Sequence, residues 1–101
     1  MQKITPVDAK KIMDTQDDIY ILDVRDPDEL DEGYIDGSVL IPLDEVAQKA
    51  ESLLPDKDKT LLVYCRSGKR SKDAAEILDN LGYKNVYDFG GILDWPFDLV
   101  I

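Results

Sequence analysis

The 101-residue sequence contains no histidine and a single cysteine, Cys65. The missing histidine excludes a Cys–His dyad, a Ser–His–Asp triad and any zinc site with a histidine ligand. The single cysteine excludes an internal disulfide bond and is typical of a protein of the reducing cytoplasm. A thiol nucleophile in this chain would have to be activated by nearby positive charge and backbone N–H groups, because no imidazole base is present.

Positive charge and long apolar segments are also scarce. The chain has 22 acidic and 12 basic residues, which gives a formal net charge of −10. Such a chain repels nucleic acid and anionic membrane surfaces at long range. The first eight residues contain no apolar stretch of signal-peptide length, and no segment approaches the length of a membrane span. We therefore expect one soluble, cytoplasmic, monomeric domain over residues 1–101, with no nucleic-acid or membrane partner.

The one cysteine stands where an apolar run meets a basic loop. Cations gather directly after it, within positions 66–72: Arg66, Lys69, Arg70 and Lys72. Cations and the backbone N–H groups of a helix start stabilise an anion and keep a thiol in its reactive thiolate form. A lone cysteine is more often an inert core residue. Here the cations, Gly68 and the helical pattern that follows together favour a reactive thiol that meets a small anion.

Apolar periodicity predicts an α/β domain with a mostly parallel sheet. Strands are expected at residues 19–22, 39–41, 61–64 and 86–89. Helices are expected at residues 6–14, 26–30, 43–54, 72–81 and 92–95. Ligands bind at the carboxyl ends of the strands in open sheets of this kind. Cys65 is predicted to lie at such an end, and so is the segment 23–25.

Several residues near these strand ends are predicted to support the structure. Asp23 and Arg25 follow a buried strand, where a polar pair usually orders a loop. Ser71 is predicted to cap the helix that follows the basic loop. Gly90 and Gly91 are predicted to form a tight turn, and Trp95 to anchor the last helix in the core.

Four segments of the chain carry a recognisable pattern: LDVRD from Leu22, GYIDGS from Gly33, VYCRSGKRS from Val63, and GY from Gly82 continuing to GGILDW, which ends at Trp95. Together they resemble the rhodanese family, the thiosulfate sulfurtransferase-like domains, in its small single-domain form. The loop CRSGKRS is the specific element. Tyr34 departs from the family pattern, which usually has histidine there, and the Gly-x-Pro expected beyond the tryptophan is missing. The resemblance implies a three-layer α/β/α fold with a five-stranded sheet, whose first strand lies near residues 3–4.

The resemblance also implies that the protein transfers sulfur by a ping-pong mechanism, without a cofactor or metal. Cys65 would attack the sulfane sulfur of thiosulfate, release sulfite and form a persulfide, which then passes sulfur to cyanide, a thiol or a protein. We expect the loop to surround the persulfide with its backbone N–H groups. The loop residues expected at the substrate are Arg66, Ser67, Gly68, Lys69, Arg70 and Ser71. Arg66 and Lys69 are the candidates for steering thiosulfate, whereas Arg70 either binds substrate or braces the loop.

Two alternatives use the same cysteine. A cysteine phosphatase or arsenate reductase of this fold places five residues between its cysteine and arginine, whereas four residues separate Cys65 from Arg70. Those enzymes also usually have histidine where this chain has Tyr64. The second alternative is a non-enzymatic persulfide carrier or thiol redox sensor, for which a reactive cysteine is equally suited.

Overall fold

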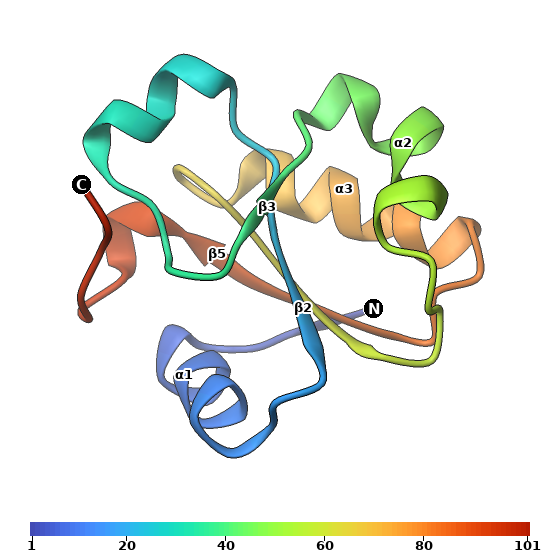
Figure 1. Ribbon diagram of the computed structural model, residues 1–101, viewed down its shortest axis with the longest axis horizontal. Helices are drawn as coiled ribbons and strands as arrows, with labels where there is room; N and C mark the ends of the chain where they lie inside the picture. The colour runs from blue at the N-terminus through green and yellow to red at the C-terminus, as the bar shows by residue number, and fades with distance from the viewer.

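Five parallel strands form a single sheet in the computed structural model, which describes residues 1–101 (Figure 1). The strand order is β1-β5-β4-β2-β3. The strands are β1 (Gln2–Lys3), β2 (Ile19–Asp23), β3 (Val39–Leu40), β4 (Thr60–Cys65) and β5 (Asn85–Gly91). The central strand β4 is buried along almost its whole length, as expected of a parallel strand covered on both faces. The predicted fold class is confirmed, including the first strand at the edge beside β5.

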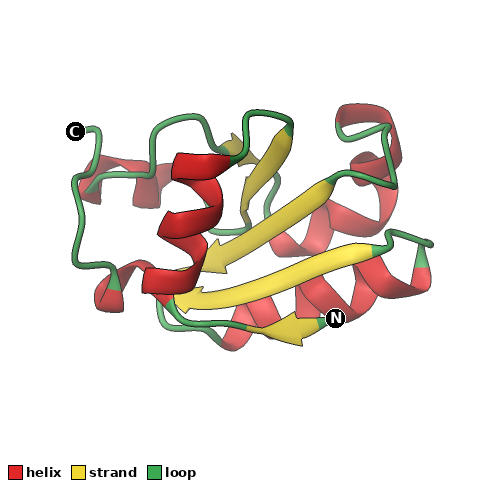
Figure 2. Cartoon of the chain, turned by 90° about the horizontal axis from the view of Figure 1, so that it is seen from below, coloured by secondary structure: helices red, strands yellow, loops and turns green.

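Helices cover both faces of the sheet (Figures 1 and 2). The helix α1 (Pro6–Thr15) packs on one face, where its Ala9 joins Leu62, Phe89 and Trp95 in one apolar cluster. On the other face, α2 (Val46–Leu53) and α3 (Lys69–Asn80) bury their apolar sides in a second cluster. Short 3-10 helices complete the chain: η1 (Pro27–Glu32), η2 (Leu43–Glu45) and η3 (Ile92–Asp94). None of the helices combines the length and apolar character needed to cross a membrane.

The prediction of one continuous α-helix over residues 43–54 is wrong. Its first three residues form the 3-10 turn η2, and the α-helix begins only at Val46. Because a 3-10 turn has three residues per turn, a single 3.6-residue period cannot run through the junction. The buried apolar residues of this segment are Val46 and Ala50 of α2 and its C-cap Leu54, whereas Leu53 is 50% exposed. A 3.6-residue period over residues 43–54 would place Leu53 on the buried side as well, and the structure corrects this.

The start of α3 also differs from the prediction. The helix begins at Lys69, three residues early, and its N-cap is Gly68 with a left-handed φ of 105°. Ser71 is therefore not the cap but lies inside the first turn, fully buried. Its hydroxyl donates to the carbonyl oxygens of Gly68 and Gly90, at 3.1 and 3.3 Å. Ser71 thus ties the loop to β5.

Gly90 and Gly91 lie at the end of β5 rather than in a separate turn, which corrects a further prediction. Gly90 has a φ of 91°, whereas the φ of Gly91 is an ordinary −117°. A Cβ on Gly91 would lie 2.1 Å from the carbonyl oxygen of Arg66, so the backbone of the cysteine loop rests directly on this glycine. Trp95 is buried beside Phe89 and Phe97, and its predicted anchoring role is confirmed.

The contact between Gly91 and the carbonyl oxygen of Arg66 predicts that alanine destabilises the fold more at Gly91 than at Gly90. Gly91→Ala should lower the free energy of unfolding by about 3 kcal/mol, because the new methyl group overlaps a backbone oxygen that cannot rotate away. Gly90→Ala should cost only about 1–2 kcal/mol, the penalty of a left-handed alanine, since no atom lies within 4 Å of its Cβ. Urea unfolding of the two variants measures the difference. An equal or smaller loss for Gly91→Ala would contradict the close approach.

Candidate active site

The sulfur of Cys65 lies at the carboxyl end of the central strand, beneath its own loop. Cys65 is the last residue of β4 and has no exposed surface. The left-handed conformation of Gly68 turns the backbone so that the Gly68 N–H donates to Sγ of Cys65, at 3.0 Å. The loop was predicted to surround the sulfur with N–H groups, and the structure places one of them, that of Gly68, in hydrogen-bond range.

The end of β5 and the turn after it contact the backbone of this loop. The carbonyl oxygen of Arg66 accepts from the Leu93 N–H at 3.2 Å. Asp88 is buried, and its Oδ1 accepts from the Gly90 N–H at 2.9 Å, which fixes the backbone on which the loop rests. The position of the loop is therefore set by backbone contacts on two sides.

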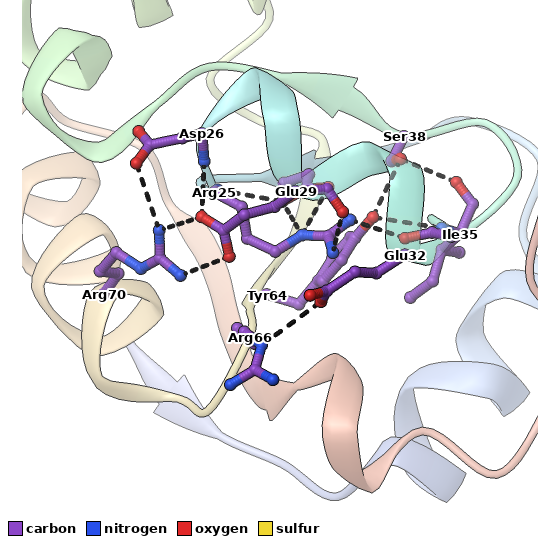
Figure 3. Close-up of polar contacts among 11 residues, drawn as sticks. Arg25, Asp26, Glu29, Glu32, Ile35, Ser38, Tyr64, Arg66 and Arg70 are labelled. Atoms are coloured by element: carbon purple, nitrogen blue, oxygen red, sulfur yellow. Dashed lines mark hydrogen bonds and ion pairs between the residues drawn. The ribbon is translucent and has the colours of Figure 1, made fainter. Parts of the chain in front are cut away.

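Arg70 is bound to a carboxylate of the same chain. Its guanidinium donates to both carboxylate oxygens of Glu29 in η1, at 2.6 and 2.9 Å, and Asp26 lies at 4.0 Å (Figure 3). These hydrogen bonds lower the pKa of Glu29 to about 2 and raise the pKa of Arg70. Of the two roles predicted for Arg70, this geometry is that of a brace between the loop and η1. Contact of Arg70 with substrate stays a prediction.

The other cations of the loop differ in their surroundings. Arg66 is half exposed and makes one contact, with Glu32, at 3.3 Å (Figure 3). Lys69 and Lys72 are exposed, and neither takes part in an ion pair. The predicted roles of Arg66 and Lys69 at the substrate remain predictions. Free positive charge beside the loop nevertheless belongs to the lysines rather than to the arginines.

Asp23 and Arg25 form a fully buried ion pair behind η1. The Arg25 guanidinium donates to the Asp23 carboxylate at 2.8 to 3.2 Å. Its remaining N–H groups donate to the carbonyl oxygens of Glu29 and Gly33, at 3.3 and 2.9 Å. The pair therefore fixes the backbone of the segment that carries Glu29, which is the loop-ordering role predicted for it.

Tyr64 connects β4 to the segment before β3. Its hydroxyl lies 3.1 Å from the Ser38 hydroxyl and accepts from the Ile35 N–H at 3.2 Å (Figure 3). Burial raises the pKa of Tyr64 to about 12, so its phenol stays neutral. The side chain before the cysteine therefore has a structural role.

Sequence reasoning missed Glu29 and Glu32 as the partners of the loop arginines. One signal could have found them, because five of the seven residues at positions 26–32 are acidic: Asp26, Asp28, Glu29, Asp31 and Glu32. This acidic segment follows β2, as the basic segment follows β4, and the two strands pair with Asp23 opposite Tyr64. No group of three or more Cys, Asp or Glu side chains is arranged to hold a metal ion.

Comparison with known proteins assigns the family. Residues 5–96 match the model of the rhodanese-like domain. The chain is 40% identical over 73 residues to the thiosulfate sulfurtransferase PspE of Escherichia coli (strain K12), covering 72% of this chain and 70% of PspE. It is 35% identical over 95 residues to YtwF of Bacillus subtilis (strain 168), covering 94% of this chain and 90% of YtwF. The crystal structure of a rhodanese-related protein from Thermoplasma volcanium matches with a TM-score of 0.85 at 34% identity, covering 99% and 98% of the two chains. The chain therefore belongs to the rhodanese-like sulfurtransferase family.

The brace between Arg70 and Glu29 predicts a pH-dependent contribution to stability. Glu29→Gln should lower the free energy of unfolding at pH 7 by about 1–2 kcal/mol, after allowance for solvent screening of a partly exposed pair. Because the folded-state pKa of Glu29 is depressed from 4.5 to about 2, this contribution is complete above pH 4.5 and is lost as the pH falls toward 2.

Urea unfolding of both proteins between pH 7 and pH 2 measures this effect, and the difference between wild type and Glu29→Gln should shrink across that interval. Glu32→Gln is the matched control, since Glu32 makes one longer contact with a half-exposed arginine. Its effect should stay below about 0.5 kcal/mol. A difference between wild type and Glu29→Gln that is independent of pH would contradict the assigned ion pair.

Proposed function

We propose that this domain moves the sulfane sulfur of thiosulfate, or of a persulfide, through a persulfide on Cys65 to a thiophilic acceptor such as cyanide or a thiol. The observation that carries the proposal is the Gly68 N–H donated to the Cys65 sulfur at 3.0 Å, in a loop that begins a helix. A backbone donor in that position favours a negative charge on sulfur both before and after reaction. Family membership supports sulfur as the transferred group.

The proposed reaction has two displacements on sulfur. In the first, the Cys65 thiolate attacks the outer sulfur of thiosulfate, the S–S bond of thiosulfate breaks, and sulfite leaves with the electron pair. In the second, the acceptor attacks the outer sulfur of the persulfide, and Cys65 leaves as a thiolate. Each displacement forms one bond to sulfur and breaks one, so no oxidant, reductant or metal is needed. The Gly68 N–H donates to the Cys65 sulfur before the first displacement and would stabilise the thiolate that leaves in the second.

Access to the sulfur requires local movement, because Cys65 has no exposed surface. Of the two arginines of the loop, Arg66 is the more weakly held, with a single 3.3 Å side-chain contact to Glu32. Arg70 is held by two short contacts instead. We infer that a small movement of the loop exposes the sulfur to the donor, while the ion pair of Arg70 keeps the start of α3 in place.

The same contacts argue against a phosphatase. A phosphate-binding loop uses its arginine to hold the oxyanion, but here Nη1 and Nη2 of Arg70 already donate to the Glu29 carboxylate. Four residues between Cys65 and Arg70 also form a smaller ring than the five of those enzymes. We expect negligible hydrolysis of aryl phosphates by the protein.

The mass of the intact protein tests the proposal. Incubation with thiosulfate should add the mass of one sulfur atom to the wild-type chain, and cyanide should remove it with release of thiocyanate. Cys65→Ser should show neither change, because the sulfur is the only nucleophilic thiol in the chain.

Two other results of the mass experiment would change the proposed function. A persulfide that forms but is not discharged by cyanide or a thiol would make the domain a sulfur carrier instead of a transferase. A wild-type mass unchanged by thiosulfate or by a persulfide donor would contradict the proposed function.

A further inference from the structure

A cleft of about 450 Å³ opens beside the cysteine loop, and no residue of η1 lines it. Ser67 and Gly68 of the loop line it, and so do three lysines: Lys3 from β1, and Lys69 and Lys72 from the start of α3. Gly68 is also the residue whose N–H donates to the Cys65 sulfur. A molecule in this cleft therefore rests against the loop that covers the sulfur.

Unpaired positive charge is concentrated in this cleft. The chain has nine lysines, of which five take part in ion pairs: Lys10, Lys49, Lys57, Lys59 and Lys84. Three of the remaining four line the cleft, and the fourth is Lys11. Asp94 is the only acidic residue in the lining. In a chain of net charge −10, this is a local excess of ammonium groups available to an anion.

The arginine side of the loop offers no comparable site. Arg66 and Arg70 face Glu32 and Glu29, so their charges are balanced within the chain. An anion that approaches the loop therefore meets net positive charge on the lysine side, where Lys3, Lys69 and Lys72 converge from two elements.

The size and walls of the cleft indicate an organic anion. Sites for organic ligands have volumes of about 300–1,000 Å³, and this cleft falls within that range, whereas thiosulfate has only five heavy atoms. Ile4 and Phe89 add apolar wall to the lysines, which suits the carbon skeleton of a ligand.

We propose that Lys3, Lys69 and Lys72 bind the carboxylates of a small organic thiol that accepts sulfur from Cys65. This inference rests on the proposed function and names its acceptor class. The thiolate of the bound acceptor attacks the outer sulfur of the persulfide, a new S–S bond forms, and the bond to Cys65 breaks. Cys65 leaves as a thiolate, and the acceptor departs as its persulfide. Electrons balance without a further reactant.

The test compares two thiols on the preformed persulfide: mercaptosuccinate, which has two carboxylates, and 2-mercaptoethanol, which has none. In the variant Lys3→Gln/Lys72→Gln, the KM for mercaptosuccinate should rise about fivefold, as expected for two partly exposed ion pairs. The KM for 2-mercaptoethanol should not change. Lys11→Gln/Lys84→Gln removes the same charge from surfaces outside the cleft and should leave both KM values at the wild-type level.

Succinate provides a second readout, because it has the carboxylates without the thiol. It should inhibit transfer to mercaptosuccinate competitively in wild type and should lose this effect in Lys3→Gln/Lys72→Gln. Equal KM values in the two double variants, or equal changes for both thiols, would overturn the inference and leave the proposed function intact. Failure of wild type to form the persulfide, measured first by mass, would instead contradict the proposed function itself.

Discussion

The bidentate ion pair between Arg70 and Glu29 joins the two segments on which the site depends. Arg70 belongs to the first turn of α3, and Glu29 to the 3-10 helix after β2, 41 positions away in the sequence. The parallel pairing of β2 with β4 brings both strand ends to one edge of the sheet. With the pair formed, the start of α3 and the loop beneath it have a fixed position relative to β2. The Gly68 N–H can then stay directed at the Cys65 sulfur.

The buried pair of Asp23 and Arg25 supports this arrangement by fixing geometry more than by adding net stability. Removal of two charges from water costs several kcal/mol per ion, and their attraction in the interior repays little beyond that. The gain lies in the other N–H groups of Arg25, which donate to the carbonyl oxygens of Glu29 and Gly33. These bonds hold the backbone of η1, so the carboxylate of Glu29 meets Arg70 with two short contacts.

Much of the fold was predictable from the sequence because its elements show local signals. Buried parallel strands read as short apolar runs, and Thr5 with Pro6 marked the start of α1, where the Thr5 hydroxyl accepts from the Asp8 N–H. The start of α3 was not predictable, because its cap is a left-handed glycine while Ser71 mimics a capping residue. Cys65 and the cations after it single out the loop that the proposed function uses, and its role in catalysis stays a prediction. The acidic segment 26–32 points to a partner for these cations but does not single out Glu29 within it, because the contact exists only once two strands far apart in sequence are paired.

The placement of charge around the sulfur fits the reaction that we propose. A thiolate paired directly with a full positive charge gains stability but loses nucleophilicity. The Glu29 carboxylate accepts from Nη1 and Nη2 of Arg70, so the charge of this arginine is shared with an ion-pair partner. A single backbone N–H then serves the sulfur, and its hydrogen bond is strengthened by the burial of Cys65. The free ammonium groups of Lys3, Lys69 and Lys72 line the cleft, where they can attract an anion, and Cys65 is not part of that lining. In the proposed reaction, attraction of the anion and attack on sulfur therefore fall to different residues.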